Sequence, residues 1–308
     1  MFYLQHEDVE LANEAFYKAQ TLDPDYALAW VGQGLVANAN QHHKDAAALF
    51  EHATGLTAAV PEADLEYATR LFNKVNESAK SRLASSEALL PAFFVLDRYC
   101  KQCPRDASAL HLFALVCERV GHVELGIEMI SRAIVVLEAA YEETEDPVIE
   151  RQFTTAHANL ARLRLSVGDY EGALESYQVA LGLLPDELEG DNTEPNTRAL
   201  LAQCQFGSGL AHFKLGQLSE ALPLLEAAMV TAGDNTIIRG HVVVLLAQTL
   251  WAIGTDDAKE SAKTQLLERY ATPTGSVSRS QGSSSVPTAS NTTQRTSWRL
   301  TRSPEWAF

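Results

Sequence analysis

The fold is decided by the stretch Ala12-Asn13-Glu14-Ala15-Phe16-Tyr17-Lys18-Ala19, which is followed five residues later by Pro24. Its pattern, Ala-x3-Phe-x2-Ala, returns as Ala46, Phe50 and Ala53, an offset of 34 residues. Weaker copies, with some positions replaced, begin at Ala92 and Gly126, and two better copies begin at Ala173 and Ala221. The successive offsets are 34, 46, 34, 47 and 48 residues. A period of this size indicates an array of helical repeats.

The first helix of one repeat contains Trp30-x2-Gln33-Gly34-x2-Ala37, close to the Trp-x2-Leu-Gly-x2-Tyr signature of the tetratricopeptide repeat. Each such repeat is a pair of antiparallel helices that buries its apolar face only by stacking on its neighbours. The sequence therefore predicts an all-α tetratricopeptide-repeat superhelix, or α-solenoid, of about six repeats over residues 1–270. The first repeat is expected to be incomplete, since residues 11–22 form a second helix with little sequence before it, as in a fragment of a longer protein.

Small residues at matched places allow two helices of a repeat to pack closely. We expect first-helix residues to face second-helix residues in these pairs: Gly34 and Ala46, Ala114 and Gly126, Ala161 and Ala173, Gly209 and Ala221. Glycines at helix ends tolerate a left-handed backbone, and prolines end or begin helices. Such positions are Gly121, Gly168 and Gly216 in turns, Pro24, Pro104 and Pro185 after second helices, and Pro61, Pro147 and Pro195 at the start of long first helices.

The chain has 308 residues and a net charge of −16. Residues 271–308 carry four Arg and one Glu, a sum of +3, which leaves −19 on residues 1–270. That acidic charge argues against direct nucleic-acid binding by the repeat array. No run of apolar residues is long enough to span a membrane, and four cysteines do not suggest a disulfide framework. We expect a cytoplasmic protein, with the nucleus as a further compartment, and a disordered Ser/Thr-rich tail over 271–308.

One group of residues has the composition of a zinc site: Cys100-x2-Cys103 with His111 and Cys117 nearby. Its spacing is not that of a standard zinc finger, and Cys117 falls where small core residues belong. A buried structural role is the alternative. No phosphate-binding loop, nucleophile elbow or zinc-protease helix is present. The prediction is therefore a non-catalytic protein without catalytic, cofactor-binding or metal-binding residues.

The first helices of a tetratricopeptide superhelix line its concave groove. The predicted partner-binding residues are Leu28, Val31, Leu35, Asn38, His111, Leu115, Arg119, Arg162, Phe206, Leu210 and Phe213. This mostly apolar lining suits a partner helix or an extended peptide. Alternatively, these residues face other helices of the same array. A co-chaperone clamp for a C-terminal carboxylate is disfavoured, because apolar residues and His111 stand where its Lys and Asn would lie.

The segment from Ala15 to Gly34, together with Leu49-Phe50-Glu51-His52-Ala53, resembles the superkiller protein 3 family, the tetratricopeptide subunits of the superkiller (Ski) complex. The resemblance covers about residues 8–268. It implies a scaffold that binds a superkiller RNA helicase and WD-repeat propeller subunits and supports exosome-linked 3′-to-5′ cytoplasmic mRNA decay, with no catalytic activity. Gln294-Arg295-Thr296-Ser297-Trp298 resembles the family's propeller-binding motif, with coincidence as the alternative.

The function predicted from the sequence is therefore a protein–protein interaction scaffold in cytoplasmic mRNA decay. Two alternatives remain open at this stage. One is a tetratricopeptide adaptor of another multiprotein complex, and the other is an enzyme whose catalytic domain lies outside this sequence.

Overall fold

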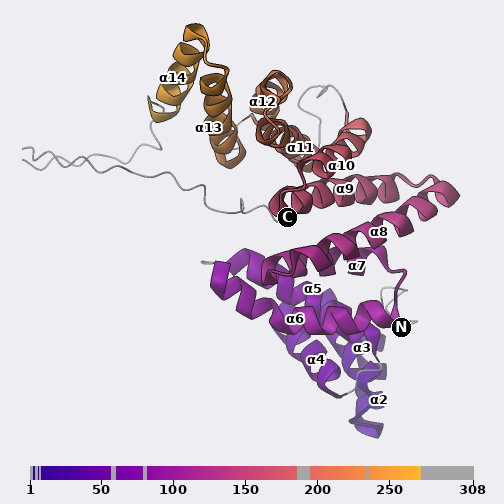
Figure 1. Ribbon diagram of the computed structural model, residues 1–308. Coiled ribbons are helices and arrows are strands. Elements are labelled where there is room, and N and C mark those ends of the chain that lie inside the picture. Colours follow the sequence, from indigo (N-terminus) through magenta and orange to yellow (C-terminus); the bar gives the residue numbers. More distant parts are fainter. Residues whose placement is uncertain are drawn as a thin grey trace, which may run out of the picture. The chain divides into compact units, whose positions relative to one another are not determined.

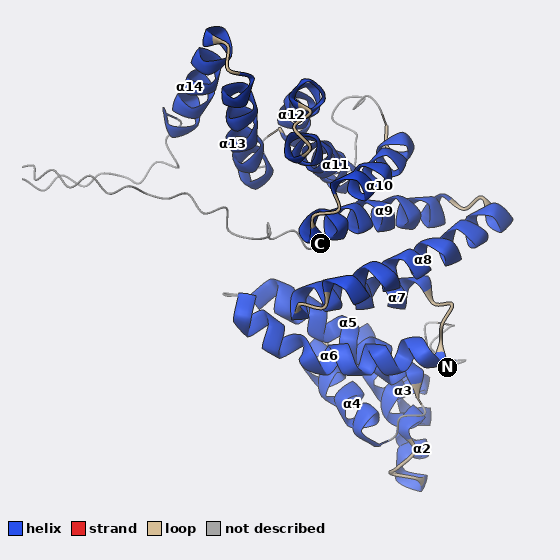
Figure 2. Cartoon of the chain, in the orientation of Figure 1, coloured by secondary structure: helices blue, strands red, loops and turns tan. Residues whose placement is uncertain are grey.

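A computed structural model describes residues 8–56, 60–78, 82–185, 195–233 and 236–271, together with Tyr3 and His6. In this part of the chain all regular structure is helical, with no strand (Figures 1 and 2). The helices are α2 (Val9–Leu22), α3 (Ala27–Ala39), α4 (His43–Leu56), α5 (Pro61–Ser78), α6 (Arg82–Gln102), α7 (Ala107–Val120), α8 (Val123–Thr144), α9 (Pro147–Val167), α10 (Tyr170–Leu183), α11 (Pro195–Lys214), α12 (Leu218–Ala232), α13 (Thr236–Ile253) and α14 (Asp256–Ala271). The predicted all-α class is confirmed.

The helices form two compact units, one from α2 to α9 and the other from α10 to α14. Within each unit every helix packs against the next one in the chain, and α5 also contacts α7, as α11 contacts α13. These are contacts between first helices of successive repeats, as expected when helix pairs stack in order. The extent of the array, predicted as residues 1–270, stays a prediction.

Small residues bring the helices of a repeat close together, as predicted. A Cβ atom added to Gly34 would lie 2.7 Å from the ring of Phe50, and one added to Gly209 would lie 2.7 Å from Leu225. At Gly126 the added atom would lie 3.0 Å from the carbonyl oxygen of Ala114. A larger side chain at any of these positions would therefore fit only if the neighbouring atoms shifted. The fourth expected pair, Ala161 and Ala173, is divided between the two units.

The expected helix boundaries are also present. Pro61, Pro147 and Pro195 are the first residues of α5, α9 and α11. At this position a backbone N–H group has no partner within the helix, so the missing N–H of proline costs no hydrogen bond. Two turns between paired helices, at Gly121 and Gly216, have φ angles of 100° and 77°, which glycine adopts without strain. Gly168 is similar, at 90°. The turn and proline pattern of the sequence therefore predicted the ends of the repeats correctly.

Burial of apolar side chains holds each unit together. The first unit has a core built around Phe50 between α3, α4 and α5, and a larger one around Leu110, Phe113 and Ile130. The second unit has a core in which Leu225 and Leu246 are buried. Within the described residues, no helix combines the length and apolar character needed to cross a bilayer. The predicted tail and the Gln294–Trp298 motif lie outside the described residues, apart from Ala271 at the end of α14.

Candidate functional site: the first-helix face

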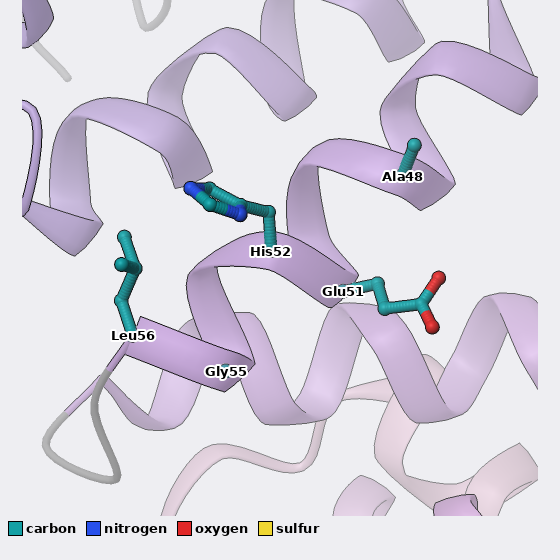
Figure 3. Close-up of a pocket in the computed structure, with 5 residues that line it drawn as sticks. All are labelled: Ala48, Glu51, His52, Gly55 and Leu56. Carbon is teal, nitrogen blue, oxygen red and sulfur yellow. The ribbon is translucent and has the colours of Figure 1, made fainter.

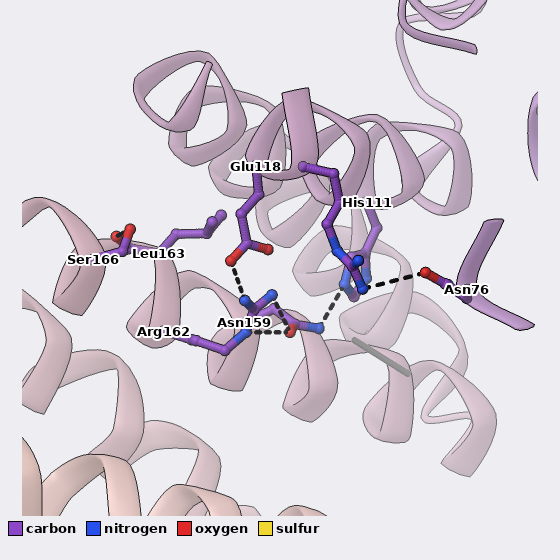
Figure 4. A network of polar contacts seen from close by, with 8 residues as sticks. Asn76, His111, Glu118, Asn159, Arg162, Leu163 and Ser166 are labelled. Carbon is purple, nitrogen blue, oxygen red and sulfur yellow. Dashed lines mark hydrogen bonds and ion pairs between the residues drawn. The ribbon is translucent and has the colours of Figure 1, made fainter. Parts of the chain in front are cut away.

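A network of polar side chains joins successive first helices of the first unit (Figure 4). Arg162 of α9 forms an ion pair with Glu118 of α7, and its Nε and Nη2 atoms donate to Asn159 Oδ1 at 3.4 and 3.2 Å. Asn159 Nδ2 lies 3.0 Å from His111 Nε2. The network therefore connects α7 and α9 through contacts between residues 44 to 48 positions apart in the sequence.

The protonation state of His111 follows from these contacts. Asn159 uses its carbonyl oxygen to accept from Arg162, so its amide nitrogen donates to His111 Nε2. The imidazole is therefore neutral, with its proton on Nδ1. Burial, and secondarily the Arg162 guanidinium, lowers the pKa of His111 from 6.5 to about 4. At neutral pH this histidine is a fixed hydrogen-bonding group and not a proton donor to a substrate.

Arg119 extends the network to a third first helix. Its Nη2 donates to Asn76 Oδ1 of α5 at 3.2 Å. Three successive first helices thus share one polar surface, which we call the first-helix face and define by Asn76, His111, Glu118, Arg119, Asn159 and Arg162. The side chains of Arg162 and Glu118 are 15% and 14% exposed, so the pair is shielded but still reaches the surface.

A second ion pair lies deeper in this unit. Asp64 of α5 is almost fully buried, and Arg98 of α6 binds both of its oxygens, with Nε to Oδ2 at 2.7 Å. The Asp64 carboxylate raises the pKa of Arg98 through hydrogen bonding. This bidentate contact fixes how α5 and α6 pack, because removal of Arg98 would leave the buried Asp64 carboxylate without its cation.

The predicted groove residues of α3 lie in different environments. Leu28 is 38% exposed, whereas Val31 is fully buried in the core around Phe50. Leu35 packs against that core, and Asn38 Oδ1 lies 3.0 Å from Nδ1 of His43, the first residue of α4. Val31 therefore belongs to the packing of the unit, and a partner could reach only the more exposed members of the set.

The remaining predicted groove residues divide in the same way. Leu115 packs against the core of the first unit, beside the polar network. In the second unit, Phe206 is buried in the core, and Leu210 and Phe213 pack against it. The structure brings His111, Arg119 and Arg162 together with their polar partners. Sequence reasoning missed Asn76 and Asn159.

The cysteines behave as core residues. Cys100, Cys117 and Cys204 are buried, and Cys103 is half-buried. Burial raises the pKa of the thiols of Cys100, Cys117 and Cys204 to about 12. His111, a member of the zinc-like set, is instead bonded to Asn159. Among the described residues, no three His, Cys, Asp or Glu side chains converge as metal ligands would.

One surface hollow lies on α4. This hollow of about 520 Å³ is lined by Ala48, Glu51, His52, Gly55 and Leu56, all on α4 (Figure 3). His52 packs edge-on against the ring of Trp30, with centroids 4.3 Å apart. A wall contributed by a single helix offers few convergent groups for a small molecule.

Family models described as tetratricopeptide repeat match residues 3–64 and 156–190. Among solved structures, YrrB, described as a TPR protein with an unusual peptide-binding site, aligns with a TM-score of 0.54 and 14% identity. The alignment covers 74% of this chain and 97% of that chain. At this identity the likeness shows the fold alone, and it agrees with the matched family models.

Several curated relatives are named for the superkiller complex. Superkiller protein 3 of Saccharomyces cerevisiae is 27% identical over 275 residues, covering 88% of this chain and 19% of that protein. Its Schizosaccharomyces pombe namesake is 30% identical over 226 residues, covering 73% of this chain and 16% of that protein. Superkiller complex protein 3 of Homo sapiens is 28% identical over 276 residues, covering 87% of this chain and 16% of that protein.

The chain thus spans less than a fifth of the length of these relatives. The resemblance noted from residues 15–34 and 49–53 is confirmed and extends across most of the chain. The chain has the helical fold of tetratricopeptide repeats, matches tetratricopeptide-repeat models over residues 3–64 and 156–190, and is similar to superkiller protein 3 over 73 to 88% of its own length.

Proposed function

We propose that this chain is a non-catalytic, protein-binding part of a superkiller-type complex in the cytoplasm. The similarity to superkiller protein 3 over 73 to 88% of the chain carries the proposal. Its partners are a superkiller RNA helicase and a WD-repeat propeller subunit, and its role is to support exosome-linked 3′-to-5′ mRNA decay. A stacked helical array suits this role because it offers a long surface on which several proteins assemble.

The proposed contact surface of the first unit is the first-helix face together with the exposed part of the predicted groove on α3, at Leu28. It presents a guanidinium group, Arg119, whose neighbour is the neutral amide of Asn76. It also presents the Glu118–Arg162 pair and apolar side chains such as Leu115. Fixed donors and acceptors beside apolar side chains favour a protein segment that carries both apolar anchors and polar groups. Direct RNA binding is not part of the proposal, because the array is strongly acidic.

Affinity purification of the tagged full chain from its own cells tests this proposal. We expect the RNA helicase and the propeller subunit to be recovered together. Leu28→Asp, which places a charge on the predicted groove, should reduce recovery of at least one of them. Leu90→Asp on α6 is the matched control, since Leu90 has a similar exposure of 41% against 38% for Leu28 but lies on a second helix.

Two outcomes would contradict the proposal. Consistent absence of both subunits, with recovery of a different stable set of proteins, would favour a tetratricopeptide adaptor of another complex. Equal loss of partners in both variants would show that the predicted groove is not the contact surface. Thermal unfolding of both variants identifies a loss that reflects misfolding.

A further inference from the structure

Helix α13 carries an apolar stripe that none of the described residues covers. Ile237, Val244 and Trp251 are 65%, 39% and 56% exposed. They are spaced seven residues apart, or two helical turns, and therefore share one face over about 21 Å. Exposed apolar side chains gathered in this way indicate a docking surface. We call these three residues the α13 stripe.

The stripe adjoins the predicted groove. His241 is exposed on the same face of α13, and its ring lies 6.5 Å from that of Phe206 on α11. Phe206 is one of the predicted partner-binding residues. A segment lying on the α13 stripe would therefore also lie near α11.

We propose that residues 294–302 of the same chain dock on the α13 stripe. This segment contains Trp298 and Leu300 as apolar anchors, with three arginines among them. Residues 271–308 have a net charge of +3, against −19 for residues 1–270, so the two parts attract each other. Aromatic side chains with neighbouring arginines are well suited to an apolar surface that has acidic residues near one end, here Asp256 and Asp257.

The charge around Trp251 supports this assignment. Trp251 lies in the last turn of α13, where backbone carbonyl groups create a partial negative charge and where no basic residue is present. Asp256 and Asp257 follow in the first turn of α14. Guanidinium groups on either side of Trp298 would be attracted to this end of the stripe. A partner with acidic residues there would be repelled.

The connection is long enough for docking within one molecule. Helices α13 and α14 pack against each other as an antiparallel pair, so α14 ends beside the start of α13 (Figure 1). Trp298 follows Ala271 by 27 residues. An extended chain of that length reaches about 90 Å, several times the length of the stripe. Because the segment is covalently linked, its effective concentration is in the millimolar range, and modest contacts suffice for docking.

Limited digestion of the full chain with trypsin tests the proposal. We expect cleavage after Arg295 and Arg299 to be about tenfold slower than in a synthetic peptide of residues 272–308, because proteolysis follows the undocked population. Cleavage after Arg279, outside the docked segment, should proceed as in the peptide. The double variant Ile237→Ala/Trp251→Ala should remove the protection, and alanine favours the helix, so α13 is expected to stay folded.

A control and two contrary outcomes complete the test. Val135→Ala/Val148→Ala removes exposed valines from α8 and α9 and should leave the protection unchanged. Equal cleavage in the full chain and the peptide would overturn the proposal, as would protection that survives Ile237→Ala/Trp251→Ala. Protection that disappears on dilution would also contradict it, since the stripe would then bind a second copy of the chain.

Discussion

The contacts described between helices differ in kind between the two units of the molecule. In the unit from α2 to α9, ion pairs and amide contacts connect separate helices, as with Asp64 and Arg98 or Glu118 and Arg162. In the described part of the unit from α10 to α14, the ion pairs Asp256–Lys259 and Glu260–Lys263 lie within α14. The core of this unit is formed by apolar side chains around Leu225 and Leu246.

This difference bears on what each unit can offer a partner. Polar contacts between first helices fix the side chains on the first-helix face, so a partner meets groups that are already oriented. The α13 stripe instead offers apolar area with little directional bonding. We infer that the first unit favours a specific segment and that the second favours burial of aromatic or aliphatic anchors.

Removal of a core side chain should have the largest effect, and it should be local to one unit. Phe113→Ala in the first unit and Leu225→Ala in the second should each lower the free energy of unfolding by about 2–5 kcal/mol. Both residues are almost fully buried. The rate of thiol alkylation at pH 8 reports the opening of each unit separately, through Cys117 in the first unit and Cys204 in the second. Burial raises the pKa of both thiols to about 12, so each reacts slowly until its unit opens.

Each substitution should increase the alkylation rate of the cysteine in its own unit more than that of the cysteine in the other unit. Half-buried Cys103 provides a reference, since its labelling depends less on unfolding. Equal acceleration of Cys117 and Cys204 by either variant would mean that the two cores open as one.

Loss of the Arg162 side chain should have the next largest effect. Arg162→Ala leaves the Glu118 carboxylate, which is largely shielded, without its cation, and removes two bonds to Asn159. We expect a decrease of about 2 kcal/mol in the free energy of unfolding, measured by urea denaturation. Lys263→Ala, which breaks a solvent-exposed pair within α14, should change it by less than about 0.5 kcal/mol. A similar small change for both variants would remove the distinction between the units.

Acid should weaken the first unit through His111. Its pKa is lowered to about 4 in the folded protein, whereas the unfolded chain takes up the proton near pH 6.5. Stability is therefore full above pH 6.5 and falls as the pH decreases from 6.5 to 4, by about 3 kcal/mol. The urea midpoint followed across this range measures the loss. His111→Gln cannot titrate and should flatten that part of the profile; an unchanged profile would assign the loss to other groups.

The sequence predicted those features of the fold that depend on local chemistry. Glycine at position 121 and proline at positions 61 and 147 act through the backbone, so their effect is independent of distant residues. The close approach at Gly34 and Gly209 was also predictable, because small residues recur with the repeat.

The polar site was less accessible to sequence reasoning. Asn76 and Arg119 are 43 positions apart, and Asn159 and His111 are 48 apart, so their pairing depends on how helices rotate against each other. Likewise, periodicity placed Val31 on the groove side of α3, yet its side chain is fully buried.

Alanine substitution at matched glycines tests most directly whether small residues let paired helices pack closely. Gly34 and Gly209 face buried neighbours, whereas an added Cβ at Gly55 of α4 or Gly182 of α10 would meet nothing within 4 Å. Thermal unfolding should show Gly34→Ala and Gly209→Ala destabilised by about 1 kcal/mol or more, and Gly55→Ala and Gly182→Ala stabilised by about 0.5 kcal/mol. Equal stabilisation at all four positions would contradict the account.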